Sequence, residues 1–134
     1  MVLIVCIDDH NGLMFNKRRV SSDKAVIADI CDRYGAAGIC ISPYSASLFQ
    51  GYEAYVTVSE EFLNNNVNVC FAECGDFVKV KDSVDTLVLY KWNRSYPSDI
   101  KFPADLYVTS MNLQSSEDFA GNSHSCITRE VYVR

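Results

Sequence analysis

The chain has 134 residues, 49% of them hydrophobic, and carries 17 acidic against 12 basic side chains. That length suits one domain with a substantial core, and the acidic balance excludes a general nucleic-acid surface, which needs positive charge over a whole face. No stretch approaches the ~20 apolar residues of a membrane span, and Asp8-Asp9 interrupts the N-terminal apolar run too early for a signal peptide. We therefore expect a single cytoplasmic domain over residues 1–134, a monomer or homodimer, without nucleic-acid or membrane partners.

The first third of the chain alternates strand and helix. Val2–Ile7 is continuously apolar, which is typical of a strand covered on both faces in the middle of a sheet. After a flexible polar loop, Ser22 is the predicted N-cap of a helix whose apolar residues follow helical spacing up to Gly35. A short buried strand, Gly38–Ile41, comes next. This succession predicts a parallel crossover.

The rest of the chain turns increasingly to strands. The expected helices are a short one through Phe49, a brief one over 60–63 capped by Ser59 and a weak one over 74–81. The expected strands cover 55–58, 67–72 and 86–90, with late strands near 106–113 and 125–133. A polar loop is expected over 93–99. The simplest arrangement is an α/β fold with a mainly parallel sheet and an antiparallel C-terminal hairpin.

Cysteines and histidines give no metal or redox pattern. The six cysteines include no CxxC pair, and neither His10 nor His124 belongs to a recognisable ligand or triad pattern. We interpret the cysteines as reduced core residues and both histidines as structural or surface residues, and we expect no metal site.

Asp23 and the basic run before it are the first candidate site. Asp23 stands at a helix start beneath a loop, where burial would raise its pKa and let it protonate or grip a ring nitrogen. The alternative is an ordinary helix-start carboxylate that interacts with the dipole. Lys17-Arg18-Arg19 could clamp a phosphate or an acidic partner, or simply be solvated.

A second set of candidates lies near strand ends. Glu73 follows a buried strand, where ligands usually meet an open parallel sheet; it could bind a ribose or an amine, or face water. Tyr90, Trp92 and Tyr96 could stack on a flat ring or pack in the core or at its rim. The candidate binding residues are Phe15, Arg18, Arg19, Ile27, Phe71, Glu73 and Tyr90.

Several motifs, in order, resemble the dihydrofolate reductase family. The first strand, the Asn11-Gly12 loop and the acidic Asp23 at a helix start resemble the family's mobile loop and catalytic carboxylate. Val67 to Tyr90 can be laid without gaps on a family strand, short helix and strand. Ser98 to Pro103 resembles Gly-Asp-Thr-x-Phe-Pro, and Asn122-Ser123-His124-Ser125 is similar to the start of the family's last strand. The resemblance implies a single-domain, three-layer reductase-like fold.

The sequence departs from the family at its cofactor motifs. Arg18-Arg19-Val20 stands near the place of the loop-closing Leu-Pro-Trp, and Ser42-Pro43-Tyr44-Ser45 replaces the phosphate-binding Gly-Arg-x-Thr. Ala72-Glu73 replaces the Gly-Gly pair that lets the backbone approach the pyrophosphate, so a Cβ and a like charge oppose the phosphates. No arginine stands where the folate tail would be held. We therefore expect no bound cofactor and no ordinary dihydrofolate reduction.

Two hypotheses follow. In the first, the chain is a non-catalytic descendant of the reductase fold, a pseudoenzyme that binds a small heterocyclic or nucleotide ligand or a protein partner through the 10–20 loop and the Asp23 helix start. In the second, it is an NAD(P)H-dependent oxidoreductase that holds NADPH differently, with Asp23 as proton donor and the nicotinamide near Phe71 and Ala72. We favour the first, because fold alone does not imply chemistry and the cofactor motifs are the part that has changed.

Overall fold

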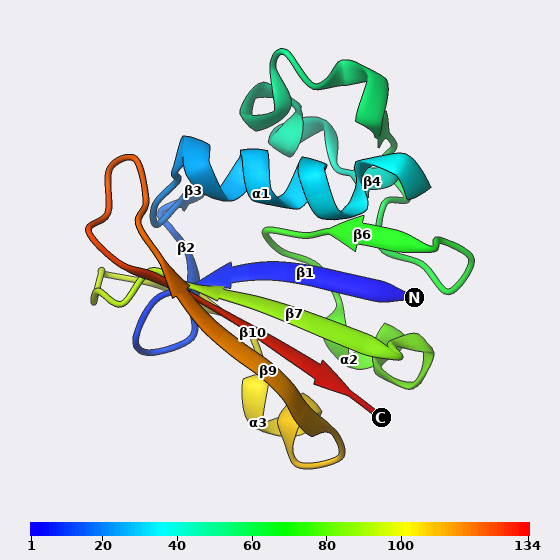
Figure 1. The fold of residues 1–134 in the computed structure, drawn as a ribbon. Helices are drawn as coiled ribbons and strands as arrows, with labels where there is room; N and C mark the ends of the chain where they lie inside the picture. Colours follow the sequence, from blue (N-terminus) through cyan, green and yellow to red (C-terminus); the bar gives the residue numbers. More distant parts are fainter.

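A computed structural model describes all residues from 1 to 134, and its main feature is a seven-stranded sheet in the order β5-β4-β6-β1-β7-β10-β9 (Figure 1). The strands are β1 (Val2–Ile7), β4 (Ile39–Ile41), β5 (Val56–Val58), β6 (Val69–Phe71), β7 (Thr86–Lys91), β9 (Asn112–Phe119) and β10 (Ile127–Val133). The first five in the order run parallel, and β10 pairs antiparallel with both β7 and β9. The predicted α/β class, with a mainly parallel sheet and an antiparallel C-terminal hairpin, is confirmed.

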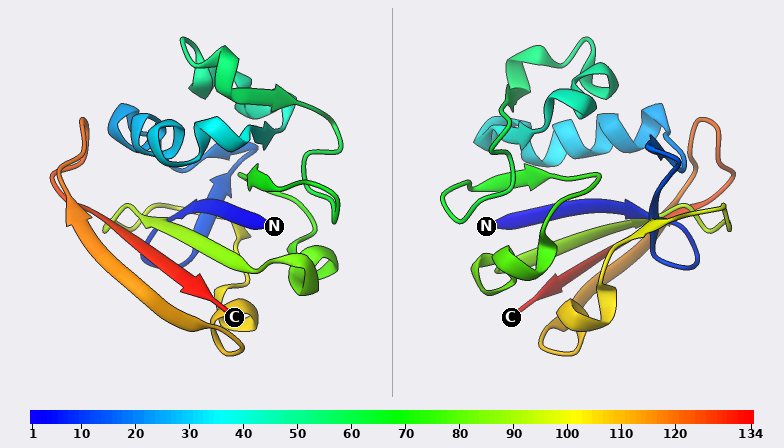
Figure 2. Two further views of the ribbon diagram at one scale, coloured as in Figure 1. Left: turned by 45° about the vertical axis from the view of Figure 1, so that its right-hand side comes forward. Right: turned by 180° about the vertical axis from the view of Figure 1, so that it is seen from behind.

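The sheet is the middle of three layers. Helix α1 (Lys24–Tyr34) covers one face, and the short helices α2 (Phe77–Val80) and α3 (Ala104–Val108) cover the other (Figures 1 and 2). Four 3-10 segments complete the helical parts: Gly35–Ala37, Pro43–Phe49, Glu53–Tyr55 and Lys81–Ser83. None of the helices is long and apolar enough to cross a membrane.

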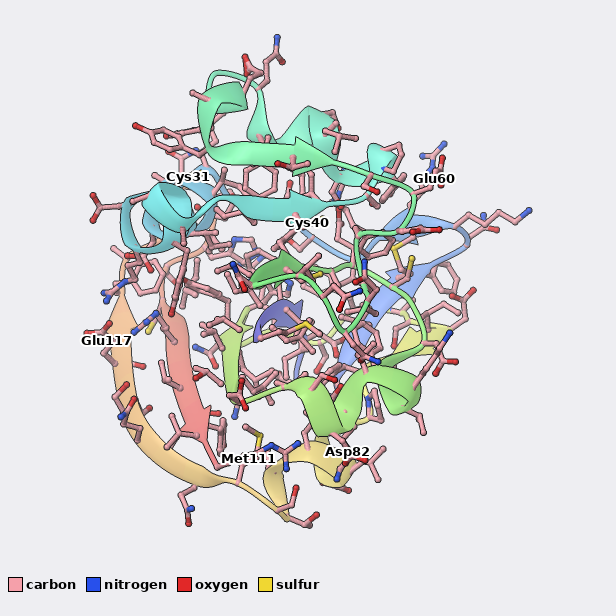
Figure 3. The ribbon with its side chains drawn as sticks, turned by 90° about the vertical axis from the view of Figure 1, so that its right-hand side faces the viewer. Cys31, Cys40, Glu60, Asp82, Met111 and Glu117 are labelled. Carbon is pink, nitrogen blue, oxygen red and sulfur yellow. The ribbon has the colours of Figure 1, made fainter.

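Side chains fill the space on both sides of the sheet, as the side view shows (Figure 3). One apolar cluster joins α1 to the sheet and contains Ile30 and Cys31, and the other, on the α2 and α3 side, contains Tyr107 and Met111. Strand β1 contributes to both clusters, and its Ile4 has no exposed surface. Its continuous apolar sequence follows from this central place.

The carboxyl ends of β1 and β6 diverge. The two strands pair from Val2↔Val69 to Ile4↔Phe71, and one further bond joins the Ala72 N–H to the Ile4 carbonyl at 3.0 Å. After β1 and the segment that follows it, the chain enters α1 on one face of the sheet, and after β6 it enters α2 on the other. Open parallel sheets bind ligands in the crevice where such crossovers part, outside the carboxyl ends of the strands.

The segment after β1 is a hairpin, which corrects the expectation of a flexible loop. Strand β2 (Gly12–Phe15) pairs with β3 (Arg18–Arg19) and, on its other side, with β8 (Ile100–Lys101). Asn16 and Lys17, the two residues of the turn, both have positive φ angles, as the favoured two-residue hairpin turn requires. The hairpin therefore reaches the carboxyl edge of the main sheet as an ordered unit.

Four other expectations are corrected. The N-cap of α1 is Asp23 and not Ser22, because the Asp23 carboxylate itself accepts the Ala25 N–H at 2.8 Å. Residues 60–63 form only turns after Ser59. The predicted strand near 106–113 is helix α3 followed by β9, which begins at Asn112. The six cysteines are unpaired, but Cys126 is exposed and only Cys31 and Cys70 are fully buried.

Candidate functional site

A small cavity lies outside the diverging ends of β1 and β6. Its walls come from the sheet, the hairpin and the first turns of α1. The apolar lining consists of Cys6, Leu13, Val20, Val26, Ile27, Leu48, Phe71, Ala72 and Trp92, and the polar lining consists of Arg19, Ser21, Ser22, Asp23 and Glu73. The space inside is about 20 Å³, room for roughly one water molecule. The ligand crevice expected of this sheet is present, and the chain itself nearly fills it.

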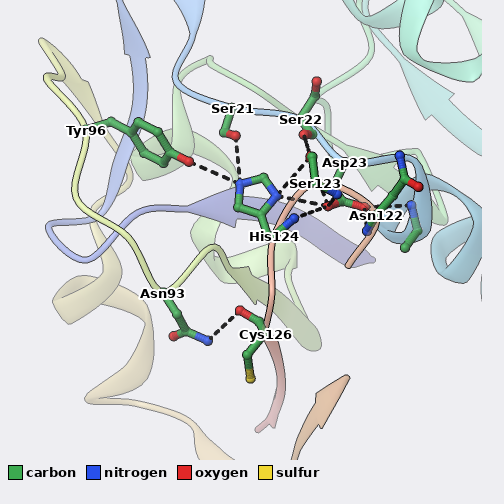
Figure 4. A network of polar contacts seen from close by, with 10 residues as sticks. Ser21, Ser22, Asp23, Asn93, Tyr96, Asn122, Ser123, His124 and Cys126 are labelled. Carbon is green, nitrogen blue, oxygen red and sulfur yellow. Dashed lines mark hydrogen bonds and ion pairs between the residues drawn. The ribbon is translucent and has the colours of Figure 1, made fainter. Parts of the chain in front are cut away.

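Asp23 is held by donors from both ends of the chain. Besides the Ala25 N–H, its carboxylate accepts the backbone N–H groups of Asn122 and Ser123, each at 2.8 Å, and that of His124 at 3.1 Å (Figure 4). The loop that supplies them joins β9 to β10 and packs closely: a Cβ added at Gly121 would lie 2.6 Å from Asp23 Oδ2. The C-terminal hairpin and the α1 N-terminus are thereby joined through one carboxylate.

These contacts determine the protonation of Asp23. Burial by itself raises the pKa of the carboxyl, but the hydrogen bonds from Asn122, His124, Ser123 and Ala25 outweigh it and hold the pKa well below its ordinary value. Asp23 is therefore an anion at neutral pH. Of the two interpretations of Asp23, a raised pKa does not agree with this direction, whereas the ordinary helix-start carboxylate does.

His124 connects Asp23 to two hydroxyl groups. Its Nδ1 lies 2.9 Å from Asp23 Oδ2, and its Nε2 lies 2.9 Å from Ser21 Oγ and 3.1 Å from the Tyr96 hydroxyl (Figure 4). The ring is 5% exposed and stacks on Trp92, with centroids 4.7 Å apart and an angle of 22° between the planes. Because Asp23 can only accept, it fixes Nδ1 as the donor and orients Nε2 toward the hydroxyls.

Glu73 and Arg19 close the opposite wall. Arg19 Nε and Nη2 donate to the two Glu73 carboxylate oxygens at 2.7 and 3.1 Å, and the Ser45 hydroxyl donates to Glu73 Oε1 at 2.7 Å. The guanidinium lies over the Tyr44 ring, 4.6 Å from its centroid. Glu73 is 8% exposed, so it does not face water. A bidentate pair of this kind is geometrically specific as well as charged.

The candidate residues predicted from sequence fall into three places. Arg19, Asp23, Ile27, Phe71 and Glu73 line the cavity together. Phe15 and Arg18 are on the hairpin and exposed. Tyr90 is buried away from the cavity, beneath α1, where its hydroxyl donates to Asp29 Oδ2 at 2.6 Å.

Several residues of the site are missing from the sequence-based set. Ser21, Trp92, Tyr96 and His124 form one group, and Tyr44 and Ser45 surround Glu73. Trp92 and Tyr96 were predicted to stack on a flat ring or to pack in the core or at its rim, and His124 to be a structural or surface residue. Asn122-Ser123-His124 was the available signal, because three small or polar residues after a glycine suit a backbone turn around an anion.

Other chemistry at this edge is limited. Burial raises the pKa of the Cys6 thiol, and nearby Glu73 raises it further, so Cys6 is protonated and a poor nucleophile. No three His, Cys, Asp or Glu side chains gather as a metal-binding group would require. The reactive geometry is that of the Asp23, His124 and Ser21 side chains.

Comparison with known proteins yields a structural match only. No protein-family model matches the sequence, and no curated protein matches it. Among solved structures, the chain is similar to dihydrofolate reductase from Enterococcus faecalis, complexed with NADP(H) and RAB-propyl, with a TM-score of 0.67 and 10% sequence identity. The match covers 100% of this chain and 96% of that one. The chain therefore has a dihydrofolate reductase-like fold, in a sequence that diverges strongly from that enzyme.

Proposed function

We propose that the chain is a ligand-binding protein built on a dihydrofolate reductase-like fold and is not a working dihydrofolate reductase. One observation carries the proposal: the bidentate Arg19–Glu73 pair spans the crevice at the end of β6. The family resemblance implies a close approach of the dinucleotide to this point, where Ala72-Glu73 replaces Gly-Gly. A buried carboxylate and a guanidinium in contact leave a pyrophosphate neither space nor a free positive partner.

The chemistry of the Glu73 site suggests which ligand binds there. Glu73 presents two acceptor oxygens, Ser45 adds a hydroxyl, and the Tyr44 ring forms one side. A small flat heterocyclic cation with two adjacent N–H donors, such as protonated 2-aminoimidazole, reproduces what the Arg19 guanidinium offers: planarity, two parallel donors and a face for stacking. Binding would require only that the Arg19 side chain leave Glu73.

The reductase hypothesis has less support. It needs Asp23 to deliver a proton, yet the hydrogen bonds on Asp23 favour the anion at neutral pH. It also needs NADPH in a crevice that Arg19 closes. We therefore propose that the chain works without a nicotinamide cofactor, and that it does so in the cytoplasm, since six unpaired thiols suit a reducing compartment.

A protein partner is the second candidate, and the outer face of the hairpin favours it. Phe15 is 48% exposed and Ile100 is 46% exposed, and they are carried by the paired strands β2 and β8. Arg18, which pairs with Phe15, is also exposed. Exposed apolar side chains and a cation on an ordered hairpin are suitable contacts for another protein.

The small-ligand proposal can be tested by emptying the Glu73 site. Arg19→Ala removes the internal guanidinium, and we expect 2-aminoimidazole or ethylguanidine, both protonated at neutral pH, to raise the melting temperature of this variant by several degrees at millimolar concentration. The double variant Arg19→Ala/Glu73→Gln is the control and should show no such rise. An equal response in both variants, or none in either, would contradict the proposal.

A further inference from the structure

We propose that Ser21 is an activated nucleophile, with His124 as its general base and Asp23 as the orienting carboxylate, and that the site transfers the acyl group of small esters or thioesters to water. This inference does not require Arg19 to leave Glu73. Ser21, His124 and Asp23 come from two segments about a hundred residues apart, and their hydrogen bonds form one continuous line (Figure 4).

The distances are those a nucleophile and its base require. Ser21 Oγ is 2.9 Å from His124 Nε2, and His124 Nδ1 is 2.9 Å from Asp23 Oδ2. A serine hydroxyl is a weak nucleophile unless a base within about 2.6–3.2 Å takes its proton, and that base must be held in the correct tautomer by a third group. Asp23 is suited to hold His124 in the correct tautomer, because its other hydrogen bonds keep the carboxylate charged and fixed.

The environment of His124 restricts it to one orientation. The ring is buried against Trp92, and its own backbone N–H also donates to Asp23. The imidazolium that forms after proton transfer would lie beside the Asp23 anion, which stabilises it. The Tyr96 hydroxyl shares Nε2 with Ser21, so it competes for the same lone pair. A substrate that displaces the Tyr96 contact would leave Ser21 as the only hydroxyl on the base.

Two hydrogen-bond donors beside the cavity have no partner. The Trp92 indole N–H is buried and unsatisfied, and the backbone N–H of Ser22 makes no hydrogen bond within the chain. Both residues line the cavity that Ser21 also lines. A buried donor without a partner, such as the Trp92 N–H, is rare; Ser22 is exposed, but the N–H that follows a nucleophilic serine is a common oxyanion donor in hydrolases. These groups are the ones that would receive the negative oxygen of a tetrahedral intermediate.

The reaction balances with water as the only co-reactant. Ser21 Oγ forms a bond to the carbonyl carbon, its proton passes to His124 Nε2, and the alcohol or thiol leaves with that proton. Water then attacks the acyl-serine, again losing its proton to His124, and releases the carboxylic acid and the free serine. The cavity of about 20 Å³ holds about one water molecule, so even a short acyl group requires its largely apolar walls to move apart.

The test is covalent labelling of the full chain by an alkyl fluorophosphonate, followed by intact mass and peptide mapping. We expect one adduct, located on Ser21. Ser21→Ala should abolish it, whereas Ser116→Ala is the matched control and should retain it, because Ser116 is an exposed serine of β9 outside the cavity. Tyr96→Phe should also retain it. His124→Gln should slow labelling at least a hundredfold, with circular dichroism to verify folding.

A turnover assay complements the labelling. With p-nitrophenyl acetate, we expect release of nitrophenol by wild type and Ser116→Ala at a rate well above that of Ser21→Ala. An absence of adduct on folded wild type, an adduct that persists in Ser21→Ala, or an adduct on Tyr96 would each overturn the proposal.

Discussion

The site contains two buried carboxylates, Asp23 and Glu73, that are satisfied in different ways. Asp23 is 4% exposed and accepts backbone N–H groups from a tight loop together with a stacked histidine. Glu73 is 8% exposed and accepts only side chains, those of Arg19 and Ser45. Backbone donors cannot leave without unfolding the loop, whereas a side chain can rotate away. Asp23 therefore keeps its backbone hydrogen bonds as long as the loop is folded, whereas a ligand can compete with the Arg19 side chain for Glu73.

The largest effect should follow from removing Asp23. Asp23→Ala leaves the N–H groups of Asn122, Ser123 and His124 without their acceptor and deletes the N-cap of α1, so we expect a loss of about 3 kcal/mol in unfolding free energy. Urea denaturation measures it. Asp32→Ala, an exposed carboxylate on the same helix, should change stability by ~0.5 kcal/mol or less. Similar losses of unfolding free energy in both variants would contradict the larger contribution of Asp23 to stability.

Removing Arg19 should cost less. Arg19→Ala leaves Glu73 charged without its cation, but the Arg19 side chain is 22% exposed and water can enter in its place, so we expect a loss of about 2 kcal/mol. Arg18→Ala, the exposed neighbour, serves as the control and should be nearly neutral. Adding Glu73→Gln to Arg19→Ala should restore part of the loss, since it removes the uncompensated charge. A double variant that is less stable than Arg19→Ala would contradict this account.

The acid dependence of stability should distinguish Asp23 as well. Its pKa is lowered in the folded protein, so its ionised form stabilises the fold above the unfolded-state pKa of about 4, and that contribution is lost as pH falls. We expect the difference in unfolding free energy between wild type and Asp23→Asn to shrink by roughly 1 kcal/mol from pH 7 to pH 3. Chemical denaturation at a series of pH values measures it. A difference that grows on acidification would reverse the assigned direction.

The smallest effect concerns a carboxylate outside the cavity. Tyr90→Phe removes the hydrogen bond to Asp29, which lies beneath α1, and should lower stability by about 1 kcal/mol or less. Because Tyr90 does not line the cavity, the variant should respond to 2-aminoimidazole and to fluorophosphonate as wild type does. Altered labelling in Tyr90→Phe would mean that the site extends beneath α1.

Local sequence patterns predicted most of the scaffold. The apolar run of β1, the helical spacing of α1 and the strands of the C-terminal hairpin each result from burial of side chains near in sequence, so periodicity finds them. Helix α3 was mistaken for a strand because a five-residue helix has too few turns to show a period. The β2–β3 hairpin was missed because its turn, Asn16-Lys17, contains no glycine, although asparagine tolerates positive φ.

Local sequence patterns predicted less of the site than of the scaffold. Asp23 and Glu73 were identified at a helix start and a strand end, but their partners are remote in sequence: His124 is 101 residues from Asp23, and Glu73 is 54 from Arg19. No local rule pairs residues over such separations. The same partners decide the chemistry, since the loop from Asn122 to His124 favours the anion of Asp23 and Arg19 holds Glu73 in an ion pair.

The most direct test of the account is whether wild-type protein binds a nicotinamide dinucleotide. Thermal melting with NADPH or NADP at ~1 mM, alone and with dihydrofolate, measures it, because binding at 100 times the dissociation constant stabilises a protein by about 2.7 kcal/mol. We predict a shift of less than ~1 °C, since the Arg19–Glu73 pair closes the crevice. A rise of several degrees in the melting temperature with either nucleotide would contradict that closure and favour the reductase hypothesis.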